Sequence, residues 1–222
     1  MKQIFLQRNH CPRLLLIFAG WGADETMFRQ YHPADSDMLL CYDYRDLAFD
    51  TTVLQGYSEL NVVGWSMGVW AASHVVSGLP LHPKLCIAIN GTPFPIDERR
   101  GIPLRIFQGT LDGLTDISPH KFLRRMCGDT ATFRRFLSVT PRRPLEELRD
   151  ELCAIAKLCG QLPPHTLQWT EAVVGRKDNI IPPANQLNAW AELHTPAQAT
   201  DEPHYPEVTF THYLQDLWTN NK

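Results

Sequence analysis

Short apolar runs that alternate with helical stretches constrain the fold of this chain more than any other feature of its sequence. Residues 14–19, 38–42, 60–63 and 85–89 are rich in Leu, Ile and Val, and Gly, Asn or Asp follows each run. Such runs are typical of parallel strands that are buried on both faces. Residues 66–77, between two of these runs, have helical character. The alternation predicts an α/β fold with a mostly parallel central sheet flanked by helices.

The composition fits one folded core. The chain has 222 residues, of which 44% are hydrophobic and 20% charged, so it is long enough for one sizeable domain and short for two. Its formal net charge of -3 is too small for a protein that binds nucleic acid through its overall field. The run at 14–19 is too short to cross a bilayer and lacks a signal-peptide cleavage site. We therefore expect a single domain over residues 1–222, in a cytoplasmic protein without nucleic-acid or membrane partners.

The six cysteines are scattered and form no Cys-x-x-Cys pair or close Cys/His set. Structural zinc sites are typically built from such closely spaced ligands. We therefore expect reduced thiols and neither a metal nor an organic cofactor. A monomer is expected, although no residue pattern specifies the oligomeric state.

The hydrophobic pattern of the sequence changes at about residue 117. Charged segments with a period near 3.6 residues replace the strand-like runs and predict a helical lid insertion over about 117–165. Pro141 and Pro144 interrupt this insertion, and a proline pair at 163–164 closes it.

Strand-like and helical patterns frame the insertion. Residues 104–108, which precede it, look like a strand, and the apolar run 172–174 resumes the strand pattern after it. Residues 208–220 have the character of a last helix. The insertion is thus expected to interrupt one continuous α/β domain.

Residues 64–68, Gly-Trp-Ser-Met-Gly, lie between a predicted strand and a predicted helix. This is the context of a nucleophile elbow, a sharp strand-to-helix turn that exposes a serine hydroxyl at the carboxyl end of a strand. The turn crowds the positions two before and two after the serine, so only very small side chains fit there. We therefore predict that Ser66 is a nucleophile.

A serine hydroxyl is a poor nucleophile at neutral pH, so it needs a histidine to accept its proton and an acid to orient that histidine. In this architecture the chain order is serine, acid, histidine. Asp178 follows the apolar run 172–174, and His204 lies in a proline-flanked loop before the last predicted helix. These two residues are our candidates. Asp112, which follows the strand-like run 104–108, is an alternative acid.

A tetrahedral intermediate needs two hydrogen-bond donors at its oxyanion. In this architecture they are the backbone N–H after the nucleophile and one from the loop after an early strand. The first would belong to Met67. The second would belong to Trp21 in the segment 18–22, Phe-Ala-Gly-Trp-Gly, whose glycines let the backbone approach a ligand closely.

The assembled motifs carry a specific resemblance. They are FAGWG at 18–22, YDYRDL at 42–47, VVGWSMG at 62–68, INGTPFPIDE at 89–98, VGRKDNIIPP at 174–183 and EPHYP at 202–206. Together they resemble the BioG-type pimeloyl-[acyl-carrier protein] methyl ester esterases of biotin synthesis, which belong to the α/β-hydrolase superfamily. The resemblance runs over about 14–204. Ala19 replaces the histidine that precedes Gly-Trp-Gly in many α/β-hydrolases, a departure typical of the BioG type.

The resemblance implies a triad of Ser66, His204 and Asp178. It also implies a substrate carried on an acyl carrier protein, whose terminal methyl ester is hydrolysed to the free pimeloyl carrier and methanol. The candidate lining of the acyl pocket consists of Trp21, Trp65, Phe94, Phe122 and Met126.

A basic cluster in the predicted insertion suggests where an acidic carrier would dock. Seven basic side chains stand against one acid, Asp129, between residues 117 and 143, a local balance of +6 in a chain whose total is -3. They are Lys121, Arg124, Arg125, Arg134, Arg135, Arg142 and Arg143. Such a patch would accelerate encounter and fix orientation. The alternative is a solvated helix face, partly neutralised by the acids that follow it at 146–151.

Two other functions stay open at this stage. A thioesterase or another small-ester hydrolase would use the same triad to cleave a different bond of an acyl-carrier or acyl-CoA substrate. A binding module on a hydrolase scaffold would lack or misplace a member of the triad. Comparison of substrates would distinguish the first alternative from the methyl ester esterase. Labelling of an activated serine would distinguish the second alternative from an enzyme.

Overall fold

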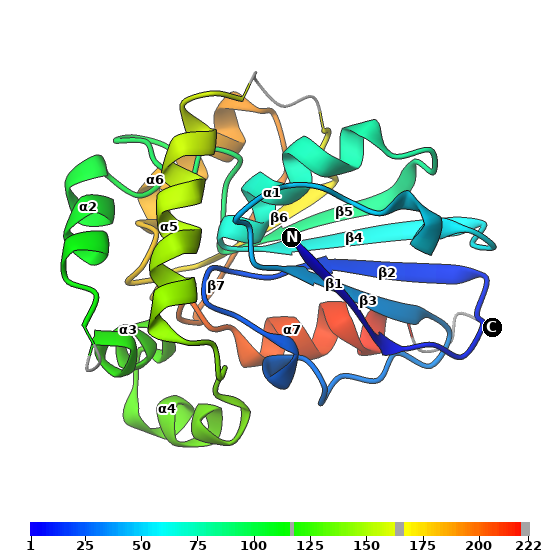
Figure 1. The fold of residues 1–222 in the computed structure, drawn as a ribbon, viewed down its shortest axis with the longest axis horizontal. Coiled ribbons are helices and arrows are strands. Elements are labelled where there is room, and N and C mark those ends of the chain that lie inside the picture. Colours follow the sequence, from blue (N-terminus) through cyan, green and yellow to red (C-terminus); the bar gives the residue numbers. More distant parts are fainter. Residues whose placement is uncertain (116–117, 163–166, 219–222) are drawn as a thin grey trace.

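The computed structural model describes residues 1–115, 118–162 and 167–218. Its described residues form a seven-stranded sheet (Figure 1). The strands are β1 (Lys2–Gln7), β2 (Arg13–Phe18), β3 (Asp37–Tyr42), β4 (Glu59–Trp65), β5 (Pro83–Ile89), β6 (Glu171–Gly175) and β7 (Ala197–Thr200). Their order across the sheet is β1-β3-β2-β4-β5-β6-β7. β1 is antiparallel to β3 and the other neighbouring pairs are parallel, so β2 to β6 end at one edge of the sheet.

Helices cover both faces of the sheet and one of its ends. They are α1 (Met67–Val75), α2 (Leu104–Asp112), α3 (Ser118–Cys127), α4 (Thr130–Phe136), α5 (Leu145–Cys159), α6 (Pro183–Glu192) and α7 (Glu207–Leu214). Figure 1 shows α1 and α7 on opposite sides of the sheet, while α2 to α5 gather beyond one end of the strands. These four helices all lie between β5 and β6 in the sequence.

The central strands form the core because their side chains are apolar on both faces. Residues 14–18 of β2 are completely buried, and every residue of β3 is buried. A tryptophan pair packs beside them, with the rings of Trp169 and Trp190 centred 6.1 Å apart. The Trp169 indole N–H donates to Ser73 Oγ at 3.0 Å, which satisfies a buried polar group on α1. Polar groups inside the core are thus used to join helices to the sheet.

The strand predictions at 14–19, 38–42, 60–63, 85–89 and 172–174 agree with β2 to β6 to within a few residues. Sequence analysis predicted neither β1 nor β7, because these two edge strands are not continuous apolar runs. It did not predict α6 either. The last helix is shorter than expected, since α7 ends at Leu214 and a 3-10 turn follows. Residues 219 and 220 of that prediction lie outside the described residues.

The strand expected at 104–108 is wrong. This segment begins α2, with Pro103 at its N-cap position. Phe107 is buried, but Arg105, which would share its face in a strand, is exposed like Leu104 and Ile106; this pattern does not fit the period of two that buries one face of a strand. The helical segment between β5 and β6 therefore starts at Leu104 rather than near residue 117. The prolines expected to close it at 163–164 lie outside the described residues.

All six cysteines are free thiols. Within residues 1–115, 118–162 and 167–218, no helix is both long and apolar enough to cross a membrane. The same part of the chain gathers no group of three His, Cys, Asp or Glu side chains that could hold a metal ion.

Candidate active site

Ser66 lies at the turn between β4 and α1, at the carboxyl edge of the sheet. Its φ of 56° and ψ of -125° are unusual for a residue with a side chain, and such strain persists only where the surroundings fix it. A Cβ at Gly68 would lie 2.0 Å from the carbonyl oxygen of Phe18, and one at Gly64 would lie 2.8 Å from the Trp169 ring. Glycine is therefore required two residues before and two residues after the serine, the positions at which the sequence pattern predicted a very small side chain.

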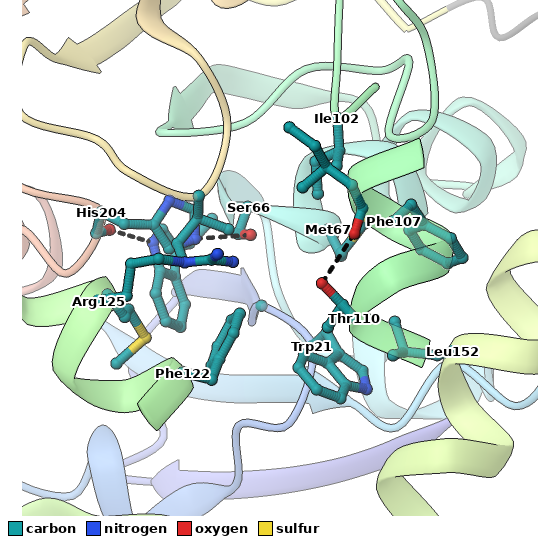
Figure 2. Close-up of a pocket in the computed structure, with 15 residues that line it drawn as sticks. Trp21, Ser66, Met67, Ile102, Phe107, Thr110, Phe122, Arg125, Leu152 and His204 are labelled. Carbon is teal, nitrogen blue, oxygen red and sulfur yellow. Dashed lines mark hydrogen bonds between the residues drawn. The ribbon is translucent and has the colours of Figure 1, made fainter. Parts of the chain in front are cut away.

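The side chains of Ser66, His204 and Asp178 form one continuous hydrogen-bonded chain. His204 Nε2 lies 2.9 Å from Ser66 Oγ, and His204 Nδ1 lies 2.8 Å from Asp178 Oδ2 (Figure 2 shows Ser66 and His204). The three residues are 5%, 1% and 5% exposed, respectively. Because water is largely excluded, these hydrogen bonds are stronger than they would be on the surface.

The loop after β6 fixes the orientation of Asp178. Its Oδ1 accepts from the backbone N–H groups of Ile180 and Ile181 at 2.7 and 3.0 Å. Its Oδ2 accepts from Gln186 Nε2 at 2.8 Å, in addition to its contact with His204. Gln186 comes from α6, an element that the sequence did not predict. The carboxylate therefore has little freedom to rotate away from the imidazole.

Asn90 joins the histidine loop to the sheet. It follows β5, and its Nδ2 donates to the carbonyl oxygens of Pro203 and His204 at 2.8 and 3.1 Å. Its Oδ1 accepts from the backbone N–H of Gly175 at 2.6 Å. The Trp65 indole also donates to the His204 carbonyl, at 2.9 Å. Sequence reasoning did not single out Asn90, although its place directly after an apolar run was a signal.

Asp112 does not take part in this arrangement. It is the last residue of α2, where its exposed carboxylate accepts from Gln108 Nε2 at 2.7 Å. Asp178 is the carboxylate that hydrogen-bonds to His204. The geometry therefore favours Asp178 as the candidate acid, because β6 ends beside the histidine loop, whereas 104–108 is not a strand.

The two residues expected to stabilise an oxyanion border the same cavity as Ser66. Met67 is the first residue of α1, so its N–H has no partner within the helix ladder. Trp21 follows Gly20, at which a Cβ would lie 3.1 Å from the Cβ of Ser66. The Gly20–Gly22 loop therefore lies directly against the serine.

The cavity beside Ser66 is largely apolar (Figure 2). Trp21, Trp65, Phe122 and Met126 line it as expected. Phe94 does not belong to this lining: its ring lies under the Arg100 guanidinium, 3.9 Å from the ring centroid. Helix α2 and the residue before Pro103 contribute lining that sequence reasoning missed, because this segment was taken for a strand. These residues are Ile102, Ile106, Phe107 and Thr110.

The expected docking arginines differ in whether they are available to a partner. The docking prediction is wrong for Arg143. Its side chain is only 4% exposed and is paired with Asp43 and Glu151, so it is not available to a partner. Arg135 is exposed but forms an ion pair with Glu207. The exposed basic side chains that keep the prediction open are Lys121, Arg124, Arg125, Arg134 and Arg142. Arg125 also borders the cavity beside Ser66.

A mostly parallel sheet with a serine at a strand-to-helix turn is the architecture of the α/β-hydrolases. The crystal structure of a lipase-esterase related protein from Clostridium acetobutylicum has this fold, with a TM-score of 0.65, 13% identity and coverage of 96% of this chain and 95% of the other. The sequence model of the family described as "Pimeloyl-ACP methyl esterase BioG" matches residues 1–215. The chain therefore belongs to the BioG family of esterases.

Two relatives are much more similar in sequence. The crystal structure of BioG from Haemophilus influenzae is 40% identical, has a TM-score of 0.85 and covers 96% of this chain and 98% of its own. A protein of Bacteroides fragilis strain 638R, described as malonyl-[acyl-carrier protein] O-methyltransferase, is 52% identical over 203 residues. That match takes in 89% of this chain but only 41% of the relative. The chain thus spans less than half the length of the Bacteroides protein.

Proposed function

We propose that this protein hydrolyses the methyl ester of pimeloyl-[acyl-carrier protein] methyl ester, giving pimeloyl-[acyl-carrier protein] and methanol. The hydrogen-bonded chain from Ser66 through His204 to Asp178, beside an apolar cavity, carries this proposal. Membership of the BioG family supports the choice of substrate.

In the proposed reaction, His204 Nε2 accepts the proton of the Ser66 hydroxyl as Oγ attacks the ester carbonyl carbon. The negative charge that develops on the carbonyl oxygen is held by the N–H groups of Trp21 and Met67. The imidazolium, stabilised by Asp178, returns the proton to the departing methoxide, and methanol leaves. Water then attacks the acyl-serine by the same steps, which regenerates Ser66 and releases the free ω-carboxylate.

Recognition of the carrier would involve the exposed basic side chains of the helical segment, which we propose acts as a lid over the cavity. An apolar pocket distinguishes one methylene by only about 1 to 3 kcal/mol, so packing alone cannot select one chain length sharply. Charge complementarity to an acidic carrier adds orientation and weakens with salt, because the Debye length is about 8 Å at physiological ionic strength.

A thioesterase is the second candidate, because the same Ser66, His204 and Asp178 would also cleave the thioester that joins the acyl chain to its carrier. Family membership favours the methyl ester. A binding module without catalysis is disfavoured, since the serine is hydrogen-bonded to a histidine that an aspartate orients. Stoichiometric labelling of Ser66 by a fluorophosphonate would count against that reading, because labelling requires an activated serine.

The test is incubation of the purified protein with the carrier-bound methyl ester, followed by intact-mass analysis of the carrier. Loss of only the methyl group is expected, and Ser66→Ala should abolish it, since triad deletion in a serine protease costs on the order of 10⁶ in kcat. Loss of the whole acyl chain would establish the thioesterase instead. An unchanged carrier would refute both hydrolytic readings for this substrate.

A further inference from the structure

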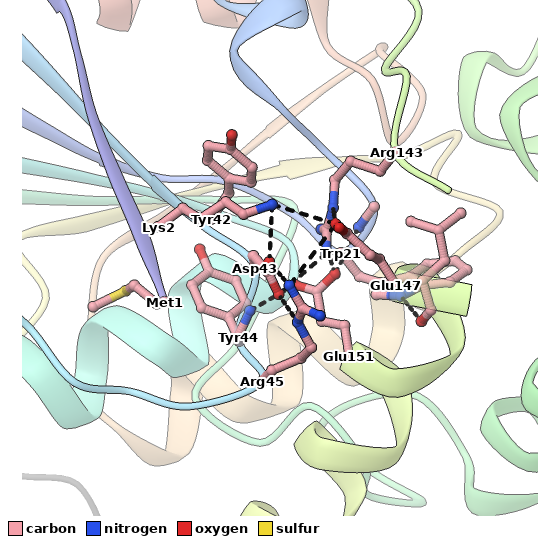
Figure 3. Close-up of polar contacts among 12 residues, drawn as sticks. Met1, Lys2, Trp21, Tyr42, Asp43, Tyr44, Arg45, Arg143, Glu147 and Glu151 are labelled. Carbon is pink, nitrogen blue, oxygen red and sulfur yellow. Dashed lines mark hydrogen bonds and ion pairs between the residues drawn. The ribbon is translucent and has the colours of Figure 1, made fainter. Parts of the chain in front are cut away.

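A buried charged cluster lies behind the Gly20–Gly22 loop and has no part in the mechanism above (Figure 3). It joins the YDYRDL segment, which begins at the last residue of β3, to helix α5. Its centre is Glu151, which is 0% exposed, with Arg143 and Asp43 beside it at 4% and 3% side-chain exposure. Burying charges is costly unless they are paired and hydrogen-bonded. The presence of buried charges at this place therefore calls for a structural or functional explanation.

Glu151 binds the backbone of two loops at once. Its Oε1 accepts from the N–H of Tyr44 at 2.8 Å, and its Oε2 accepts from the N–H of Gly22 at 3.4 Å. Arg143 Nη1 donates to the same Oε2 at 2.6 Å. One carboxylate therefore connects α5 both to the segment after β3 and to the loop that lies against Ser66.

Further contacts hold that loop from both sides. The Trp21 indole N–H donates to the carbonyl oxygen of Leu148 at 2.9 Å, one turn before Glu151 on α5. The Tyr44 hydroxyl donates to the carbonyl oxygen of Ala19 at 2.7 Å. The backbone N–H of Ala19 donates to the carbonyl oxygen of Cys41 at 2.9 Å. Contacts with α5 and with the end of β3 thus fix the position of the Trp21 backbone N–H.

The charges of the cluster balance. The cations are Lys2, Arg45 and Arg143, and the anions are Asp43, Glu147 and Glu151. A balanced cluster has no net attraction for a further anion, so it is not an anion-binding site. Asp43 also has a φ of 64°, a conformation uncommon for a residue with a side chain, which its neighbours must hold in place.

We propose that Glu151 is a positioning residue for the Gly20–Gly22 loop. Through its contacts with this loop it aims the backbone N–H of Trp21 at the reacting carbonyl. This inference rests on the proposed function in two respects, the use of Ser66 as a nucleophile and of the Trp21 backbone N–H as an oxyanion donor. It explains why the YDYRDL segment and α5 carry buried charges that touch neither Ser66 nor His204. The oxyanion contact tightens only in the transition state, so the effect of Glu151 belongs in kcat rather than in KM.

The experiment compares Glu151→Gln with Asp37→Asn in hydrolysis of p-nitrophenyl acetate. Asp37 is a matched control because it is a buried carboxylate that accepts from the backbone N–H of Asn9 and Cys11, at the opposite end of the parallel strands. Glu151→Gln should lower kcat roughly 10- to 100-fold at a KM within about twofold of the wild-type value. Asp37→Asn should lower the Tm but leave kcat per folded molecule unchanged.

A double variant, Arg143→Leu with Glu151→Leu, guards against simple misfolding. Removing both charges leaves neither of the two buried without its partner, Asp43 keeps its ion pairs with Lys2 and Arg45, and such replacements are often tolerated by the fold. The folded double variant should show the same loss of kcat. Wild-type kcat in either folded Glu151 variant, or a loss confined to KM, would overturn the inference.

The choice of substrate keeps the two proposals distinguishable. If the wild-type protein cleaves p-nitrophenyl acetate but not the carrier-bound methyl ester, the proposed substrate is wrong while the kcat contrast still decides the role of Glu151. If the wild-type protein cleaves neither ester, both proposals are overturned.

Discussion

Gly68→Ala tests how tightly the elbow and the Gly20–Gly22 loop are packed. A Cβ at Gly68 would lie 2.0 Å from the carbonyl oxygen of Phe18 and 2.5 Å from that of Ala19, whereas real Cβ atoms essentially never approach within 3.0 Å of such neighbours. Both contacts are with backbone, so no side chain can turn away. The end of β2 must therefore retreat by about 1 Å, and a misplacement of that size costs roughly 100-fold in rate.

The same overpacking should lower stability. Extra atoms in a well-packed interior cost about 1 to 3 kcal/mol, which for a chain of this size corresponds to a drop in Tm of roughly 2 to 12 °C. Gly78→Ala is the matched control, because a Cβ there meets nothing within 4 Å. We expect Gly78→Ala to keep the wild-type kcat and to leave the Tm unchanged or slightly raised.

The assay is steady-state hydrolysis of p-nitrophenyl acetate at a temperature where both variants are folded by circular dichroism, together with thermal melts. Gly68→Ala should lose kcat even when it is fully folded, since the displaced backbone leads into the Gly20–Gly22 loop. Activity within about twofold of wild type in a folded Gly68→Ala protein would refute the claim that Ser66 and this loop are held in one tight packing arrangement.

Three further outcomes are expected. Asp178→Asn should reduce kcat by about 10⁴, as loss of the orienting acid does in a serine protease, whereas Asp112→Asn should keep the wild-type rate; equal losses would reopen the choice of acid. Arg124→Glu with Arg134→Glu should raise KM for the carrier-bound ester, more so at low salt, without changing kcat for p-nitrophenyl acetate; equal effects on both substrates would exclude docking at these residues. Burial acts to raise the pKa of Asp37, but hydrogen bonds from a tyrosine hydroxyl and two backbone N–H groups outweigh it and hold that pKa below its ordinary value. The stability contributed by Asp37 is therefore complete above the unfolded-state pKa of about 3.9 and is lost as the pH falls through the lower folded-state value, so urea unfolding of Asp37→Asn should depend less on pH between about 2 and 4 than that of the wild type.

Local patterns were sufficient for much of the fold. The buried strands β2 to β6 could be predicted because strands covered on both faces require continuous apolar runs. The elbow could be predicted because its five-residue motif is local, although the nearest atoms that exclude a Cβ at Gly64 and Gly68 belong to Trp169 and to the end of β2. The prediction for 104–108 failed because the pattern there is too short. Five residues with three large apolar side chains do not by themselves distinguish a strand from one turn of helix.

Residues far apart in the sequence had to be brought together by the sheet. Asp178 and Asp112 were both plausible acids in the sequence, and only the pairing of β5 with β6 puts the loop of Asp178 beside His204. Asn90 holds the His204 loop and Gln186 holds Asp178, through contacts that no short motif encodes. Their roles follow from strand order, which depends on long-range pairing.

The sequence by itself determined the class of fold, the place of the serine and the family resemblance, because hydrophobic periodicity and short motifs are local properties of the chain. The tertiary structure decided which charges are available. Arg143 counts as one more basic residue in the sequence, yet its side chain is buried against Asp43 and Glu151. Whether a charge faces solvent or a buried partner depends on segments as far apart in the sequence as Asp43 and Arg143, and only the folded chain brings those segments into contact.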